Sequence, residues 1–206
     1  MPAGRDMPLT SPQLVELAVQ CAPGVASQTL LAVAQVESGF EPLAIGVNGR
    51  RPMRLTPATR AEASATAQSL IAGGASIDLG LGQINSRNLA WLGLSISDAF
   101  DPCLNLAASA RILSADYRRA AAWSGDEQSA LRTALSLYNT GDVRRGFLNG
   151  YVARVGRAAS HGAPTFQQRG PVLRVSAALR PPAWDVFAAP AVKISSFVFT
   201  MTGADR

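Results

Sequence analysis

Glu37 is the residue of this sequence best placed for acid–base chemistry. Residues 27–36 predict a helix with Ser27 as its N-cap, and Gly39 marks the end of that helix. Glu37 shares a face with the apolar residues three, four and seven positions before it, so burial should raise the pKa of its carboxyl group. The negative end of the helix dipole should raise this pKa as well. A carboxyl group protonated near neutral pH can serve as a general acid, although a solvated glutamate is the alternative for this residue alone.

Two later stretches combine polar side chains with glycine. Gly80 and Gly82, within residues 77–85, interrupt helical periodicity. They indicate either backbone that lies close to another group or a tight loop between core elements. Residues 137–141 close a predicted helix and include Tyr138, although a tyrosine at such a position is commonly a core residue with a satisfied hydroxyl group.

Three further side chains are weaker candidates. Asp78 is a better candidate for a second carboxylate than Glu41. Glu41 is the acidic residue nearest to Glu37 in the sequence, but it follows Gly39 and should be solvated. Tyr151 either lines a cleft or packs in the core.

The patterns around these residues predict a mainly α fold with a small β hairpin. Asn48-Gly49, within residues 43–50, is a strong hairpin signal. Apolar residues recur at helical spacing through most of the remainder, and Ser11 and Asp126 are predicted N-caps. The expected helices span residues 11–21, 27–36, 57–72, 101–119, 126–139 and 151–159, with shorter pieces at 86–92 and 95–100.

Length and composition fit one domain with appendages. The chain has 206 residues, of which 48% are hydrophobic and 16% are charged, enough for a sizeable core. No uninterrupted apolar run approaches the roughly 18 residues of a membrane span, so no integral membrane segment is expected. We assign residues 1–10 to an N-terminal extension and residues 11–159 to the folded domain. Residues 160–206 form a proline-punctuated basic tail with a strand-like run at 192–201, or alternatively a disordered tail.

Charge and cysteine content limit the partners. The net charge of +5 favours an anionic partner such as cell wall, lipid or nucleic acid, and the lack of a dense basic block argues against nucleic acid. Cys21 and Cys103 lie outside CxxC pairs and His161 is the only histidine, so no metal site is expected. The cysteines are either free and buried or joined in a disulfide.

Residues 1–8 lack the apolar core of a secretory signal. The protein is then cytoplasmic, its export segment lies outside this sequence, or export uses another route.

The order and spacing of three stretches resemble the catalytic domain of lytic transglycosylases with a goose-type lysozyme-like fold. These stretches are Glu37-Ser38-Gly39-Phe40, Gly80-Leu81-Gly82-Gln83-Ile84-Asn85 and Leu137-Tyr138-Asn139-Thr140-Gly141. Residues 42–49, 78–80, 99–103 and 138–141 further resemble the peptidoglycan-cleaving component of type IV secretion and conjugation systems. The resemblance covers residues 11–159 and implies a mainly α, lysozyme-like fold that uses no cofactor.

In the family that this chain resembles, the glutamate of the Glu-Ser pair is the only catalytic acid, here Glu37. It would protonate the glycosidic oxygen between N-acetylmuramic acid and N-acetylglucosamine. It would then accept a proton from the C6 hydroxyl group, whose attack on C1 gives a 1,6-anhydro product. Gly82 stands where the family usually has Met, which would widen the floor of the cleft. By this resemblance, Tyr138 and Asn139 match a pair whose side chains point at the catalytic glutamate. The resemblance also implies a set of substrate-binding residues: Ser38, Gln83, Ile84, Asn85, Tyr138 and Asn139.

The resemblance also implies a setting outside the cytoplasm. Because the wall lies there, we expect a periplasmic protein in which Cys21 and Cys103 form a disulfide that stabilises the fold by about 4 kcal/mol. Residues 160–206 carry +3 of the +5 net charge. We expect this tail to bind the secretion or conjugation machinery rather than to take part in cleavage. Two other functions stay open: a hydrolytic muramidase, which needs a carboxylate to activate water, and a non-catalytic scaffold that binds peptidoglycan.

Overall fold

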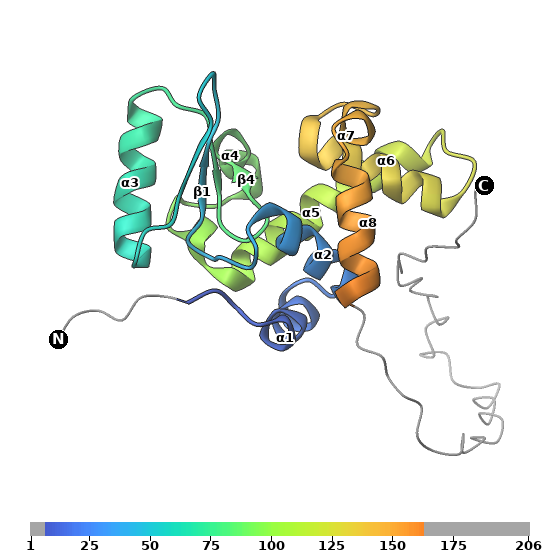
Figure 1. The fold of residues 1–206 in the computed structure, drawn as a ribbon, viewed down its shortest axis with the longest axis horizontal. Coiled ribbons are helices and arrows are strands. Elements are labelled where there is room, and N and C mark those ends of the chain that lie inside the picture. Colours follow the sequence, from blue (N-terminus) through green and yellow to red (C-terminus); the bar gives the residue numbers. More distant parts are fainter. Residues whose placement is uncertain (1–6, 163–206) are drawn as a thin grey trace, which may run out of the picture.

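The computed structural model describes residues 7–162, which form a mainly helical fold with one small antiparallel sheet (Figure 1). The helices are α1 (Ser11–Cys21), α2 (Ser27–Glu37), α3 (Arg60–Ala72), α4 (Leu89–Leu92), α5 (Pro102–Ala121), α6 (Glu127–Thr140), α7 (Arg145–Leu148) and α8 (Tyr151–Gly162), with 3₁₀ turns η1 (Ser86–Asn88) and η2 (Asp98–Phe100). The strands are β1 (Ile45–Val47), β2 (Met53–Leu55), β3 (Ile77–Leu79) and β4 (Ile84–Asn85). The predicted fold class is therefore confirmed. No helix within residues 7–162 is long and apolar enough to cross a membrane.

The predicted hairpin is part of a four-stranded sheet with the order β2-β1-β3-β4. β1 and β2 form the hairpin, with Gly46 opposite Arg54, and β3 pairs with the other edge of β1, with Gly46 opposite Asp78. β4 follows Gly80 and Gly82 and pairs Asn85 with Asp78 of β3. The strands before and after these glycines therefore bring the side chains of Asp78 and Asn85 together.

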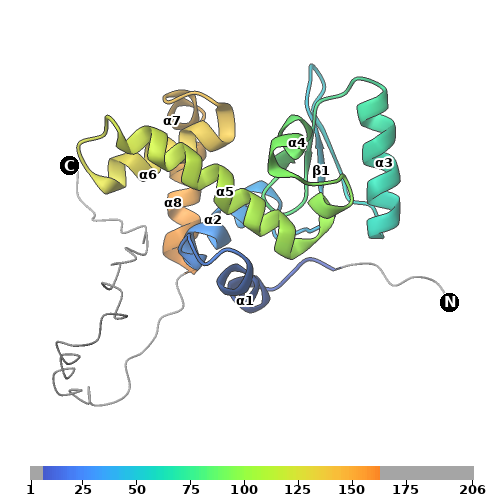
Figure 2. The same cartoon turned by 180° about the vertical axis from the view of Figure 1, so that it is seen from behind.

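Two hydrophobic cores divide the fold, and α5 contributes to both. Leu106 and Leu113 of α5 pack in one core with residues of α1, α2, α6 and α8, whereas Ala108 packs in the other core with residues of the sheet, α3 and α4. Figures 1 and 2 show α5 running between a group formed by the sheet, α3 and α4 and a group formed by α6, α7 and α8. This helix therefore sets the position of the two groups relative to each other.

The middle of α2 is enclosed by its neighbours. Every residue from Thr29 to Ala34 is buried, as expected for a helix with apolar contacts on all sides. Its N-cap is Ala26, so the prediction of Ser27 as the N-cap is wrong by one residue. The same error occurs at α1, whose N-cap is Thr10 rather than Ser11. In both cases the residue before the serine has the non-helical backbone of a cap, and the serine is the first helical residue.

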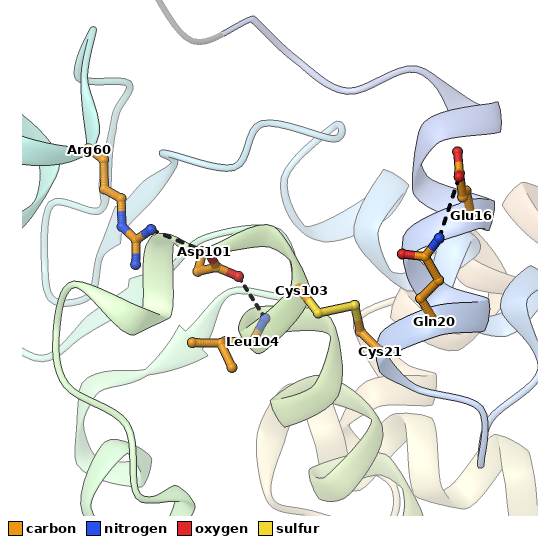
Figure 3. The surroundings of a disulfide bond; sticks show 7 residues. All are labelled: Glu16, Gln20, Cys21, Arg60, Asp101, Cys103 and Leu104. Carbon is orange, nitrogen blue, oxygen red and sulfur yellow. Dashed lines mark hydrogen bonds and ion pairs between the residues drawn. A yellow bond between two sulfur atoms is a disulfide. The ribbon is translucent and has the colours of Figure 1, made fainter.

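A disulfide joins Cys21 at the end of α1 to Cys103 in the first turn of α5, as predicted (Figure 3). The Cα atoms of the two cysteines lie 5.4 Å apart. Next to the bond, Asp101 caps α5 by accepting a hydrogen bond from the backbone N–H of Leu104 (3.0 Å) and forms an ion pair with Arg60 of α3 (3.3 Å). The start of α5 is thus tied covalently to α1 and electrostatically to α3.

Candidate active site

A cleft of about 510 Å³ lies between the sheet and α6, with Glu37 in its wall. Ser38 does not line this cleft, because it is 4% exposed and its hydroxyl group donates to the carbonyl of Ala34 (3.1 Å). Glu41, which was expected to be solvated, is partly buried and is not part of the cleft wall. The predicted site residues that line the cleft are Glu37, Gln83, Ile84, Asn85, Tyr138 and Asn139.

A positively charged side chain lies at the C-terminal end of α2. Gly39 and Phe40 both have left-handed backbone (φ 64° and 70°), which turns the chain sharply after Glu37. The guanidinium group of Arg54 on β2 donates to the carbonyl of Glu37 (3.1 Å) and to that of Ser38. A positive charge at this position offsets the negative end of the helix dipole. The predicted contribution of the dipole to the pKa of Glu37 is therefore opposed by Arg54.

The carboxyl group of Glu37 keeps its proton up to near neutral pH. Loss of hydration on burial is the largest cause, and together with the negative charge of Asp78 it raises the pKa to about 7. The hydrogen bond from Tyr151 and the charges of Arg154 and Arg54 lower this pKa without cancelling the effect of burial. Desolvation, which the apolar face of the helix predicted, is thus the main reason that Glu37 can act as an acid.

Tyr151, the first residue of α8, fixes the position of the Glu37 carboxyl group. Its hydroxyl group donates a 2.7 Å hydrogen bond to Glu37 Oε1. Its side chain is 1% exposed, and its backbone N–H donates to Asn149 Oδ1 (2.9 Å). Sequence reasoning left open whether this residue lines a cleft or packs, and the structure places it in the core with only its hydroxyl group directed at Glu37. No local signal identifies the contact, because the two residues lie 114 positions apart.

Tyr138 and Gly82 pack against each other. The hydroxyl group of Tyr138 donates to the carbonyl of Gly82 (2.7 Å) rather than to Glu37, towards which the family resemblance directed it. A Cβ atom on Gly82 would lie 2.8 Å from this hydroxyl group and would also collide with Ser109 Oγ. Gly82 is therefore required by close packing. The expected widening of the cleft floor is wrong, because Tyr138 and Ser109 fill the space that a larger side chain would take.

Asn105 of α5 holds the glycine-rich stretch in place, and sequence reasoning missed it. Its side-chain amide donates to the carbonyls of Leu79 (2.9 Å) and Ala99 (2.6 Å), and its Oδ1 accepts from the backbone N–H of Gly82 (2.8 Å). The residue is 1% exposed. A polar residue among the apolar positions of a predicted helix is the one signal that could have identified it. Since its polar atoms are satisfied internally, we interpret Asn105 as a structural support for the cleft.

Asp78 is a second carboxylate in the same cleft, held by two amides. Asn48 Nδ2 donates to one carboxylate oxygen (2.8 Å) and Asn85 Nδ2 to the other (2.7 Å). Gln83 is fixed by its left-handed backbone (φ 50°) and by a hydrogen bond from its Nε2 to the carbonyl of Gly80 (2.8 Å). Asp78 therefore adds a fixed negative charge to the cleft. Within the described part of the chain, no cluster of three or more His, Cys, Asp or Glu side chains could hold a metal ion.

Comparison with known proteins gives a consistent assignment. The transglycosylase SLT domain model matches residues 16–158. The chain is 51% identical over 132 residues to type IV secretion system protein virB1 of Brucella abortus, covering 64% of this chain and 55% of that protein. It is 40% identical over 168 residues to protein virB1 of Agrobacterium fabrum, covering 82% of this chain and 68% of that protein.

A further relative and the coverage of these matches complete the comparison. A third relative, protein virB1 of Rhizobium radiobacter, is 43% identical over 158 residues, which cover 76% of this chain and 65% of that protein. The chain spans just over half the length of the Brucella relatives (55%). No solved structure matches the chain significantly. The family match extends from α1 into α8 and includes every element of the cleft, and the chain therefore belongs to the transglycosylase SLT domain family, whose fold is lysozyme-like.

Proposed function

We propose that this protein is a peptidoglycan lytic transglycosylase. It cleaves the β-1,4 bond between N-acetylmuramic acid and N-acetylglucosamine and leaves a 1,6-anhydro end. The observation that carries the proposal is the carboxyl group of Glu37, which lines the cleft, has a pKa raised to about 7 and accepts a hydrogen bond from Tyr151. Membership of a family named for transglycosylase activity supports the same reaction.

The reaction needs one group that first donates a proton and then accepts one. Glu37 donates its proton to the glycosidic oxygen as the bond to C1 breaks, and the resulting carboxylate takes a proton from the C6 hydroxyl group, which attacks C1. The proton count of Glu37 is unchanged after one turnover. The hydroxyl group of Tyr151 hydrogen-bonds the carboxylate between the two transfers, since it stabilises the charged form. No water is consumed, so a second carboxylate is not required for this reaction.

A hydrolytic muramidase is the second candidate, because Asp78 lines the same cleft as Glu37. A second carboxylate could activate water for attack on C1. Both oxygens of Asp78 already accept hydrogen bonds from Asn48 and Asn85, however, so both are engaged by side-chain amides rather than directed at a water molecule. We therefore rank transglycosylation above hydrolysis, and a non-catalytic scaffold below both.

The products of wall digestion test the reaction. Purified peptidoglycan is treated with the wild-type protein, with Glu37→Gln and with Glu16→Gln, a control that removes an exposed carboxylate on α1. The wild type and the control should release muropeptides with 1,6-anhydro ends, lighter by one water than hydrolysed ends, and Glu37→Gln should release none. Hydrolysed ends from the wild type would instead identify a muramidase, and wall binding without release would identify a scaffold.

We further propose that cleavage occurs in the periplasm and opens the wall for a type IV secretion or conjugation apparatus. One relative is named a type IV secretion system protein. The disulfide between Cys21 and Cys103 suits an oxidising compartment. The predicted binding of this apparatus through residues 160–206 falls almost wholly on residues 163–206, outside the described residues. The division into residues 1–10, 11–159 and 160–206 stays a prediction.

A truncated chain tests the role of the tail. α8 extends to Gly162, so the chain should be ended there rather than within the helix. We expect this protein to cleave purified peptidoglycan at the wild-type rate and to support secretion or conjugation poorly in cells. If the truncated chain fails to fold in soluble form, the tail belongs to the folded domain and the proposed division is wrong.

A further inference from the structure

A carboxyl group on α5 lines the cleft without taking part in the proposed reaction. Asp116 is partly buried in the cleft wall beside Ile112, which precedes it by one helical turn. Within the described residues its carboxyl group has no hydrogen bond and no ion pair, and burial raises its pKa to about 6 although Arg119 lowers it. Desolvated carboxyl groups normally have a partner. Asp116 therefore has hydrogen-bonding capacity available in the cleft.

An aromatic side chain is exposed in the wall of the same cleft. Trp91 of α4 lines the cleft and is 51% exposed, so much of its indole is accessible to a ligand. The guanidinium group of Arg111 lies 5.6 Å from the centre of the Trp91 ring. Arg111 is itself fixed by a 2.8 Å hydrogen bond from its Nη1 to the carbonyl of Leu92. The indole is thus supported from α5 while remaining accessible.

We propose that Trp91 and Asp116 form a sugar-binding subsite on the α4–α5 side of the cleft, which holds a saccharide unit of the glycan away from the bond that is cleaved. The proposal rests on the proposed function, because it takes the glycan as the ligand. A pyranose ring has an apolar C–H face that packs on an indole, and hydroxyl and acetamido groups that donate to a carboxylate. Ligand pockets commonly combine such an apolar surface with a few polar groups.

The charges around the pair favour a neutral sugar over a cationic group of the wall peptide. Arg111 stacks on Trp91 and Arg119 acts on the charge of Asp116, so these two cations offset the attraction of Asp116 for a ligand amine. A sugar carries no charge at these positions and only needs an acceptor for its hydroxyl or amide protons. The Trp91–Asp116 subsite therefore selects for the glycan backbone.

Asp116 is not one of the groups that act on the pKa of Glu37. Its charge acts on the hydroxyl group of Tyr138, whereas the groups that act on Glu37 are Tyr151, Asp78, Arg154 and Arg54. A sugar unit held away from the cleaved bond keeps the same contacts in the ground state and in the transition state, which is uniform binding. Loss of Trp91 or Asp116 should therefore raise KM and leave kcat unchanged.

Binding to an inactive protein tests the subsite directly. Trp91→Ala and Asp116→Asn are each introduced into full-length Glu37→Gln protein, and the Kd for a peptide-free hexamer of β-1,4-linked N-acetylglucosamine is measured by calorimetry. We expect each change to weaken binding about tenfold, as for loss of a hydrogen bond to a charged group or of a stacked aromatic ring. The matched controls are Trp123→Ala, which removes an exposed tryptophan outside the cleft wall, and Glu16→Gln, and both should leave Kd unchanged.

Kinetics of the otherwise wild-type protein give a second readout. On soluble peptide-free glycan, Trp91→Ala and Asp116→Asn should raise KM by the same factor as Kd, with kcat within about twofold of wild type. Asp116→Asn preserves the shape of the side chain, so it keeps the test meaningful if Trp91→Ala disturbs folding. Unchanged Kd and KM in both variants, or a fall in kcat at constant KM, overturns the subsite.

The two proposals can fail separately. If the wild type releases no saccharide from the wall, yet the hexamer binds and Trp91→Ala weakens that binding, the proposed reaction is wrong and the subsite stands. If the wild type releases 1,6-anhydro products and neither variant changes Kd or KM, the reaction stands and the subsite is wrong. A protein that neither cleaves the wall nor binds the hexamer overturns both proposals.

Discussion

Glu37 and Asp116 are two carboxyl groups in the wall of one cleft, and burial raises the pKa of both, to about 7 and about 6. Their neighbours differ. Glu37 accepts a hydrogen bond from Tyr151 and feels the charge of Asp78, whereas Asp116 has no hydrogen bond within the described residues. A raised pKa therefore marks a desolvated group and does not by itself identify a catalytic acid. The hydrogen bond from Tyr151 and the charge of Asp78 make Glu37 the candidate acid. The carboxyl group of Asp116, which has hydrogen-bonding capacity left over, is instead a candidate substrate-binding group.

The largest expected effect is loss of activity in Glu37→Gln. The amide has the shape of the acid but cannot donate an acidic proton, so the rate of wall cleavage should fall by a factor of about 10² to 10⁴. The rate of muropeptide release measures this change, and circular dichroism checks that the fold is kept. Asp116→Asn, the matched change at the other carboxyl group, should leave kcat unchanged. Equal losses of kcat in the two variants would remove the distinction between the two residues.

The same substitution should stabilise the protein at high pH. The pKa of Glu37 is about 7 in the folded protein and 4.5 in the unfolded chain. Between these two pH values the unfolded chain binds fewer protons than the folded protein, so the free energy of unfolding falls as pH rises. Glu37→Gln removes this loss. Its free energy of unfolding should exceed that of the wild type by about 3 kcal/mol at about pH 8 and match it at about pH 4. Urea denaturation at the two pH values measures the difference, and a constant difference would contradict the raised pKa.

Tyr151→Phe should have a smaller effect on the rate and should move its pH dependence. The hydrogen bond from Tyr151 lowers the pKa of Glu37, so its removal raises that pKa further. Cleavage requires protonated Glu37, and the decline of kcat/KM at alkaline pH should therefore move to higher pH. Loss of the fixed geometry should also reduce kcat about tenfold. An alkaline decline at the wild-type pH would show that the hydroxyl group does not stabilise the carboxylate.

Asp78→Asn should produce the smallest shift, and in the opposite direction. The charge of Asp78 raises the pKa of Glu37, so the neutral amide should move the alkaline decline of kcat/KM to lower pH. If Asp78 acts only as a fixed charge, the variant should retain most of its activity. If Asp78 is the base that activates water, the variant should lose all activity. A pH–rate profile of the purified variant measures both quantities. Complete loss of activity without misfolding would favour the muramidase.

The parts of the fold that follow from local sequence were predictable. Asp126 caps α6 as expected, since a cap depends on a side chain and the backbone within one turn. The burial of Glu37 followed from the apolar face of its helix. The pairing of β4 with β3 was not predictable, because strands of two and three residues show no periodicity. The N-caps of α1 and α2 were predicted one residue too late. A serine suits both the N-cap and the first helical position, so its presence alone does not fix which of the two it occupies.

The site was predictable only in the residues that carry recognisable motifs. The three motifs of the family resemblance supply cleft residues, namely Glu37, Gln83, Tyr138 and Asn139. The contact between Tyr151 and Glu37, the role of Asn105 and the packing around Gly82 depend on elements that meet only after folding. A sequence pattern reports which residues recur together, whereas a hydrogen bond across 114 positions requires the tertiary structure.

The source of the oxygen in the product tests the central claim most directly. Purified peptidoglycan is digested by the wild-type protein in water enriched in the heavy oxygen isotope, and the released muropeptides are analysed by mass spectrometry. If Glu37 acts alone and the C6 hydroxyl group attacks C1, the new ends are 1,6-anhydro and contain no heavy oxygen. Reducing ends that contain one heavy oxygen atom would contradict the account, because they would show that water attacks C1.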